Sequence, residues 1–145
     1  MASEGLHVAR QIFARQIFVN LPVKDLKRSV TFFTALGFSF NLQFTNDDAT
    51  CMIIGENFYA MLLVEPFFKR FTHKAIADAS KTTEVLVALA VDDREVVDAL
   101  VAKARAAGGA VPREPQDMGF MYSHGFEDPD GHIWEVFHMS EMPPA

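Results

Sequence analysis

The chain has 145 residues and a formal net charge of −6, and half of its residues are hydrophobic, with 14 Phe among them. This composition excludes a disordered chain, and the length suits one compact domain or two small, similar halves that share a core. No stripe of Lys and Arg is present to bind phosphates, so we expect no nucleic-acid partner. No stretch approaches the roughly 20 apolar residues of a membrane span, so we expect no membrane partner. Cys51 is the single cysteine, which excludes an intramolecular disulfide and, without a signal-peptide pattern, predicts a cytoplasmic protein.

The first 15 residues are predicted to form an N-terminal extension. The segment RQIF at residues 10–13 is repeated at residues 15–18, where the second copy leads into the first strand. We therefore expect the ordered domain to begin at residue 16, and the first copy to be dispensable.

A strand at residues 16–23, QIFVNLPV, precedes an amphipathic helix that Asp25 can cap and Gly37 can end. The apolar positions that recur at helical spacing are Leu26, Val30, Phe33 and Leu36. Three short runs with strand character follow, at residues 38–45, 49–54 and 58–64. The first half of the domain, residues 16–64, is thus predicted to be a βαβββ unit.

A connector at residues 65–83 carries three Phe beside basic residues, which favours either a helix packed over the core or a lid over a pocket. The first pattern then repeats at residues 84–139, where NLPVKDL…ALGF is answered by ALAVDDR…AAGGA. The fold class predicted is α+β, with two tandem βαβββ units whose curled mixed sheets bury their apolar faces around a groove. Residues 140–145 are predicted to be a tail.

The paired units, the opening NLPVKDLKRSVTFFTALGF and the closing EDPDGHIWEVF resemble the vicinal oxygen chelate superfamily, over residues 16–139. This superfamily includes glyoxalase I, bleomycin-binding proteins and extradiol dioxygenases. Within it the chain looks most like the bacterial group labelled "predicted lactoylglutathione lyase". The resemblance implies a bacterial protein that forms a homodimer and binds a small molecule in the groove.

Metal-using relatives imply four ligand positions, and this sequence matches one of them. Their histidine positions fall here on Phe18 and Leu86, their first acid falls on Leu62 or Leu63, and only Glu135 is a ligand type. Transition-metal sites need several protein donors of suitable geometry. We therefore predict no metal site and no cofactor.

The closing stretch GFEDPDGHIWEVFHM predicts a hairpin with Pro129 and Asp130 at its tip. A tight turn there would place His124 directly opposite Glu135, on one sheet face. The two could act as a catalytic acid–base pair, or simply satisfy each other in a core. Groove-lining, ligand-binding positions are predicted at Phe18, Asn20, Leu86 and Tyr122.

Other polar residues of this stretch receive structural roles in the prediction. Strand parity puts His132, Trp134 and His138 on the face opposite to Glu135. Asp128 and Asp130 are interpreted as turn formers.

Two functions remain open at this point. The first is a metal-free small-molecule-binding protein of unassigned ligand, motivated by the apolar residues at the ligand positions. The second is an enzyme, a lyase or isomerase that uses His124 and Glu135 for proton transfer.

Overall fold

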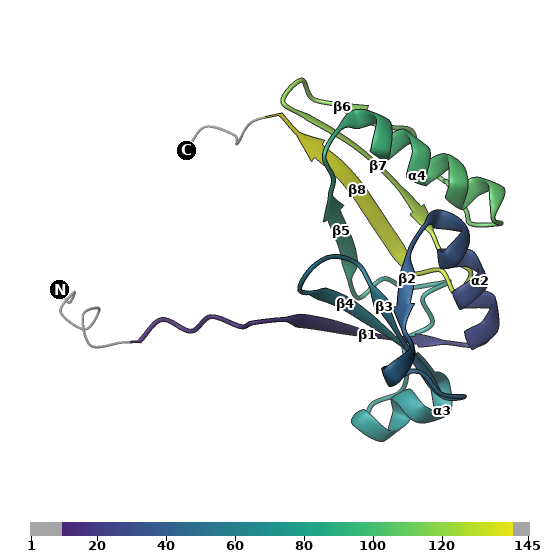
Figure 1. The fold of residues 1–145 in the computed structure, drawn as a ribbon. Coiled ribbons are helices and arrows are strands. Elements are labelled where there is room, and N and C mark those ends of the chain that lie inside the picture. Colours follow the sequence, from purple (N-terminus) through teal and green to yellow (C-terminus); the bar gives the residue numbers. More distant parts are fainter. Residues whose placement is uncertain (1–9, 141–145) are drawn as a thin grey trace.

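The computed structural model describes residues 10–140, which form two βαβββ units (Figure 1). Residues 1–9 and 141–145, which include most of the predicted extension and tail, lie outside the described residues. The first unit consists of β1 (Ile17–Val23), α2 (Leu26–Leu36), β2 (Ser39–Asn41), β3 (Ala49–Ile53) and β4 (Phe58–Val64). The second consists of β5 (Leu86–Ala90), α4 (Arg94–Ala106), β6 (Gln116–Asp117), β7 (Met121–Glu127) and β8 (Ile133–Met139). The predicted α+β fold class is confirmed.

Each unit contains one four-stranded mixed sheet with the same topology. The strand orders are β1-β4-β3-β2 and β5-β8-β7-β6, and the first two strands of each order are parallel. The connector holds α3 (Glu65–Phe68) and the 3-10 helix η2 (Lys69–Phe71), and then continues without regular structure to β5. None of the helices in the described part of the chain is long and apolar enough to cross a membrane.

Two predicted strands are shorter than expected. The run at residues 38–45 ends at Asn41, whose side chain accepts a hydrogen bond from the Gln43 amide and starts the 3-10 helix η1 (Leu42–Phe44). The segment AVPREP at residues 110–115, where the repeat of the βαβββ pattern predicts the strand after the second helix, forms only one isolated bridge, between Ala110 and Glu127. Its two prolines have no amide hydrogen to donate to a neighbouring strand.

The capping residues predicted for the first helix are confirmed. The Asp25 carboxylate accepts a hydrogen bond from the Arg28 amide at 3.1 Å, and Gly37 ends the helix with a φ of 107°. In the second unit Asp93 caps α4 in the same way, by accepting from the Val96 amide at 2.9 Å. These local signals fix where the two helices begin, and so which of their faces meets the core.

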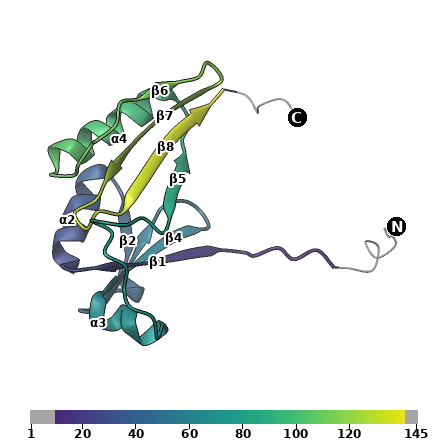
Figure 2. The same ribbon diagram turned by 180° about the vertical axis from the view of Figure 1, so that it is seen from behind.

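The two units share one core, in which α2 packs against the second sheet. The Phe33 ring meets Trp134 edge-on with centroids 5.2 Å apart, and Phe32 lies 6.0 Å from Phe126. Helices α2 and α4 lie side by side on the same side of the molecule (Figures 1 and 2). The sheets were expected to bury their apolar faces against one another around a groove, and in the structure it is the helix-covered faces that form the common core. Each sheet keeps an open face, defined as the face opposite to its own helix.

The turn Asp128–His132 joins β7 to β8 and is built around a buried aspartate. The Asp128 amide donates to the His132 carbonyl at 3.0 Å, and the Gly131 amide donates to the Asp128 carbonyl at 2.9 Å. The Asp128 carboxylate accepts from the amides of Asp130 and His132 and from the indole nitrogen of Trp134 at 3.0 Å. Burial raises the pKa of this carboxyl, although the charge interaction with His132 and the hydrogen bonds from Trp134 and the Asp130 amide act to lower it.

The same turn links the second unit to the first. Asp130 accepts hydrogen bonds from the Lys24 amide at 2.9 Å, from the Arg28 guanidinium at 3.3 Å and from the Ser29 hydroxyl at 3.3 Å. The turn-forming role predicted for Asp128 and Asp130 is confirmed. Asp130 also holds the start of α2 against the turn, which sequence reasoning did not predict.

We predict that Asp128→Ala lowers the free energy of unfolding by about 1–3 kcal/mol, because buried donors, including the indole of Trp134, lose their acceptor. Urea denaturation followed by tryptophan fluorescence measures this loss. The control is Asp117→Ala, which removes the exposed ion pair with Arg94 and should cost clearly less. Equal losses for the two variants would contradict the role assigned to Asp128.

Candidate functional site

Glu135 lies on the open face of the second sheet, at a position flanked by small residues. Its neighbours in β8, Trp134 and Val136, are fully buried on the helix side, and side chains alternate along a strand. Across the sheet Glu135 pairs with Gly125 on β7 and Ala88 on β5. A side chain at position 125 would lie only 2.9 Å from the Trp134 carbonyl oxygen, so only glycine fits there. The space beside the carboxylate is therefore left open.

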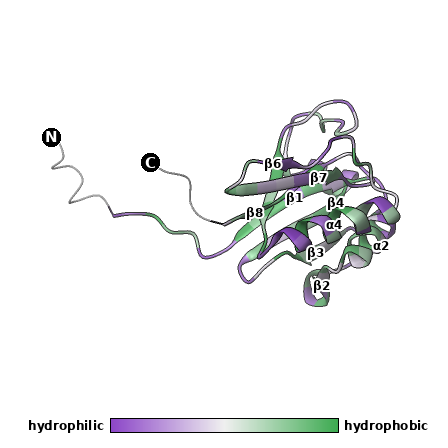
Figure 3. Ribbon diagram, turned by 90° about the horizontal axis from the view of Figure 1, so that it is seen from above, coloured by the Kyte–Doolittle hydropathy of each residue, from purple (hydrophilic) through white to green (hydrophobic). Residues whose placement is uncertain are grey.

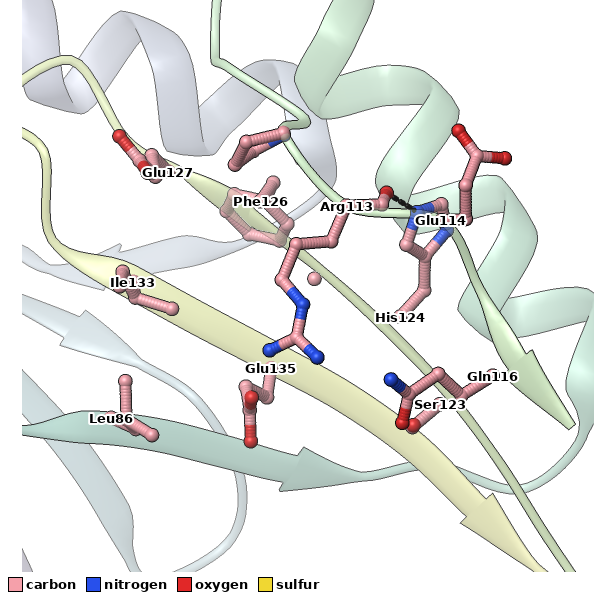
Figure 4. A pocket seen from close by; sticks show the side chains of 12 residues that line it. Leu86, Arg113, Glu114, Gln116, Ser123, His124, Phe126, Glu127, Ile133 and Glu135 are labelled. Carbon is pink, nitrogen blue, oxygen red and sulfur yellow. Dashed lines mark hydrogen bonds between the residues drawn. The ribbon is translucent and has the colours of Figure 1, made fainter. Parts of the chain in front are cut away.

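A pocket of about 200 Å³ lies at this point of the open face (Figure 4). One wall is formed by β5, β7 and β8, and the other by the segment between α4 and β6. Its lining includes four charged residues, two polar residues and two large aliphatic residues: Arg113, Glu114, Glu127 and Glu135, Gln116 and Ser123, and Leu86 and Ile133. The pocket thus combines an apolar floor with a few polar groups, as small-molecule sites commonly do.

Arg113 provides the positive charge of the pocket. Its guanidinium extends across the pocket towards Glu135, and the Gln116 carboxamide points into the same space (Figure 4). Two ion pairs occur in the described residues, Arg28–Asp130 and Arg94–Asp117, so within residues 10–140 neither Arg113 nor Glu135 takes part in one. Glu114 and Glu127 also line the pocket, but their carboxylates point away from the guanidinium (Figure 4). Arg113 and Glu135 are therefore the opposite charges that face each other, and they are not joined in an ion pair.

The predicted pairing of His124 with Glu135 is wrong by one residue of register. His124 lies opposite Val136, and Gly125 takes the place opposite Glu135. The expected two-residue tip would have paired Asp128 with Gly131, whereas here Glu127 pairs with Ile133 and five residues form the turn. A shift of one residue moves a side chain to the other sheet face, so the two groups are not on one face.

His124 instead holds the wall of the pocket in place. Its Nε2 lies 2.8 Å from the carbonyl oxygen of Arg113. A carbonyl can only accept, so this ring nitrogen donates and carries a hydrogen. The ring thereby fixes the backbone from which the Arg113 side chain reaches into the pocket.

Tyr122 was predicted to line the groove, and the same register change places it on the helix face. Its hydroxyl donates to the Asp98 carboxylate on α4 at 2.6 Å, and this hydrogen bond raises the pKa of the phenol. The Arg94 guanidinium stacks 4.9 Å from the ring centroid and pairs with Asp117 at 2.7 Å. Tyr122 therefore fastens β7 to the start of α4 and does not line the pocket.

The remaining predicted positions are divided between the two sheets. Leu86 lines the pocket with Glu135, whereas Phe18 is on the open face of the first sheet, stacked on Tyr59 at 4.8 Å. Asn20 lines a separate pocket of about 380 Å³ between the first unit, the connector and the turn. The ligand positions predicted from sequence are thus not gathered into one site.

His132 and His138 lie away from Glu135, as strand parity predicted. The Nε2 of His132 is 2.7 Å from the Pro22 carbonyl oxygen, and the Nδ1 of His138 is 3.0 Å from the Val91 carbonyl oxygen. The His132 ring thus ties the turn before β8 to β1, and the His138 ring ties β8 to the residue that follows β5. Trp134, on the same face, is packed against α2 as expected.

Sequence reasoning missed Arg113, Gln116 and Ser123. Arg113 stands between two prolines in an irregular segment, and no periodicity marks it as part of a site. Its place over Glu135 depends on the path of the loop after α4. The only available signal was a basic residue in a loop that follows a helix.

Two tandem βαβββ units, with a pocket of small-molecule size on the open face of one sheet, define the class of this protein. The chain belongs to the Glyoxalase/Bleomycin resistance protein/Dioxygenase superfamily, whose family profile matches residues 15–136. The superfamily predicted from sequence is confirmed. The finer resemblance to the "predicted lactoylglutathione lyase" group stays a prediction.

Solved structures share the fold of this chain. A hypothetical protein from S. aureus is 32% identical, with a TM-score of 0.74 over 88% of this chain and 96% of that one. A genomically encoded fosfomycin resistance protein from Listeria monocytogenes is 18% identical, with a TM-score of 0.65 over 92% and 97% of the two chains. An antibiotic-binding protein from a Streptomyces species is also 18% identical, with a TM-score of 0.65 over 90% and 99%. No curated protein matches the chain in a sequence comparison.

The residues at the metal-ligand positions of the superfamily do not fit a divalent ion. Phe18 and Leu86 have no donor atom, and of the two candidates for the first acid only Leu63 shares the face of Phe18, while Leu62 is in the core. In the described part of the chain, no group of three or more His, Cys, Asp or Glu is placed to hold a metal. Glu135 is therefore available for another purpose.

We predict that His124→Ala and Glu135→Gln are additive in their effects on stability. Side chains on opposite sheet faces that make no direct contact should show a coupling below about 0.5 kcal/mol in a double-mutant cycle. The matched positive control is the cycle of Tyr122→Phe with Asp98→Ala, whose groups are hydrogen-bonded at 2.6 Å and should couple measurably. Strong coupling between His124 and Glu135 would contradict the register described here and favour the one predicted from sequence.

Proposed function

We propose that the protein binds a small organic molecule on the open face of its second sheet, at Glu135, without a divalent metal. The observation that carries this proposal is the pocket of about 200 Å³ in which the superfamily's one remaining ligand-type residue stands opposite Arg113. A cationic side chain here supplies positive charge where metal-using relatives place an ion. The pocket is open to a ligand and is lined by both apolar and polar groups.

The chemistry of the donor set supports the metal-free part of the proposal. Zn, Fe and related ions are held by several N, S or O donors at once. Here Glu135 has Gly125 and Ala88 beside it, and the equivalent positions on the first strands are Phe18 and Leu86. One carboxylate alone would hold such an ion weakly.

The structural relatives support binding as the general activity. One is described as an antibiotic-binding protein and another as a fosfomycin resistance protein, and both share the fold of this chain. The alternative of a lyase or isomerase depended on a His124/Glu135 pair. Since these side chains lie on opposite faces, no observation favours that mechanism and we do not propose it.

We predict that protein purified without chelators contains far less than stoichiometric Ni, Zn or Fe, because the pocket offers a single carboxylate at the ligand positions. Elemental analysis by mass spectrometry measures the content. A thermal-shift series with the same ions is the companion test, since a ligand that prefers the folded state raises Tm. The metal-free proposal would be contradicted by a stoichiometric ion that raises Tm, if Glu135→Gln abolished both the bound ion and the rise in Tm.

We further propose that the protein is a homodimer. The exposed large hydrophobic side chains include Ile17, Phe18 and Phe58 at the starts of β1 and β4, and Leu86 at the start of β5. Phe18 is 46% exposed and Leu86 is 51% exposed. Figure 3 shows that β1, β4 and β8 are largely hydrophobic along their length. An apolar surface of this kind on a folded domain marks an interaction site. A second copy of the chain is the partner that the superfamily resemblance implies. We also propose that the protein is cytoplasmic, because its free, buried Cys51 suits a reducing compartment.

We predict that light scattering after size exclusion gives twice the chain mass, and that Phe18→Lys with Phe58→Lys shifts the protein towards the monomer by placing charges in the apolar surface. Leu42→Lys is the control, because Leu42 is 80% exposed but follows β2, at the opposite edge of the first sheet from β1. A monomeric wild-type protein would overturn the proposed dimer. If the control and the double variant shifted equally towards the monomer, the surface around Phe18 and Phe58 would not be the dimer interface.

A further inference from the structure

We propose that the ligand is a small carboxylic acid that also carries a hydroxyl or amino group close to the carboxylate. The carboxylate binds the Arg113 guanidinium, and the hydroxyl or amino group donates a hydrogen bond to Glu135. This inference rests on the proposed function and names the ligand class for the same pocket.

Arg113 and Glu135, the two charged groups that face each other in the pocket, require different partners. Arg113 presents a planar fork of donors, which matches the two oxygens of a carboxylate. Ionised Glu135 can only accept hydrogen bonds, so it needs a donor. A simple acid would leave Glu135 facing a second anion, and a simple amine would leave Arg113 facing a second cation. A ligand with both groups satisfies both residues.

The layout of the pocket places these requirements within the reach of one small molecule. Arg113 and Glu135 come from opposite walls, and the Gln116 carboxamide lies to one side of them, near Ser123 (Figure 4). The volume of about 200 Å³ lies below the usual range of small-molecule sites, which favours a small acid over a large conjugate. Leu86 and Ile133 line the floor and favour an apolar substituent on the acid.

The backbone of Arg113 is already fixed before a ligand arrives. The hydrogen bond from the His124 ring to the Arg113 carbonyl oxygen holds the loop at 2.8 Å. Immobilising a loop in its binding conformation lowers the entropic cost of association. His124 is thus a positioning residue for the anion-binding group.

Three related probes separate the requirements: mandelate carries a carboxylate, a hydroxyl and a phenyl ring, phenylacetate lacks the hydroxyl, and 1-phenylethanol lacks the carboxylate. The test is a titration of the full chain with each probe, followed by NMR shifts of the amides that line the pocket. We expect mandelate to bind most tightly. Removal of either polar group should weaken binding by about tenfold, the usual order for a hydrogen bond to a charged group.

Matched variants assign each contact. Arg113→Gln should weaken mandelate and phenylacetate by about tenfold and leave 1-phenylethanol unchanged, since only the acids use the guanidinium. Glu135→Gln should weaken mandelate without weakening phenylacetate. Arg105→Gln is the control, because Arg105 is an exposed arginine of α4 that does not line the pocket.

The outcomes distinguish this inference from the function on which it rests. Binding of 1-phenylethanol as tight as that of mandelate, unchanged by Arg113→Gln, would overturn the acid class and leave a small-molecule pocket. If none of the three probes shifts the pocket amides, the proposed function falls together with the ligand class.

Discussion

The turn Asp128–His132 fixes the register of β7 against β8, and this register decides which side chains reach the pocket. The turn is held by the buried Asp128 carboxylate, which accepts from two backbone amides and from the indole of Trp134. With Glu127 paired to Ile133, glycine rather than histidine falls beside Glu135. The space that a histidine would have filled is open to a ligand, and the histidine holds Arg113 from the other side of the strand. Binding chemistry in this pocket therefore depends on a turn several residues away.

The shared core explains why the pocket belongs to one unit. Phe32 and Phe33 of α2 pack against Phe126 and Trp134 of the second sheet, and Asp130 hydrogen-bonds the start of α2. The units are thus joined through their helix-covered faces. Within residues 10–140 the open faces do not complete each other, and the pocket at Glu135 is lined by residues of the second unit. This arrangement also leaves apolar residues of β1, β4 and β5 exposed.

Much of the fold could be predicted from the sequence because its signals are local. Apolar spacing and the capping residues Asp25 and Gly37 predicted α2, and the repeat of the same pattern predicted two βαβββ units, both confirmed. The hairpin register could not be predicted, since Asp-Pro-Asp-Gly fits a tight turn as well as a longer one. The choice between them depends on burial of Asp128 against Trp134, which is a tertiary contact. Arg113 escaped prediction for a similar reason, because its position is set by the hydrogen bond to His124.

A crystal structure of protein purified without chelators tests the central claim most directly, namely that Glu135 faces Arg113 across a ligand pocket rather than binding a metal. The account predicts Gly125 opposite Glu135, the His124 ring on the Arg113 carbonyl, and water or an organic molecule between the guanidinium and the carboxylate. A metal ion coordinated by Glu135, or His124 lying opposite Glu135 on the open face, would contradict it.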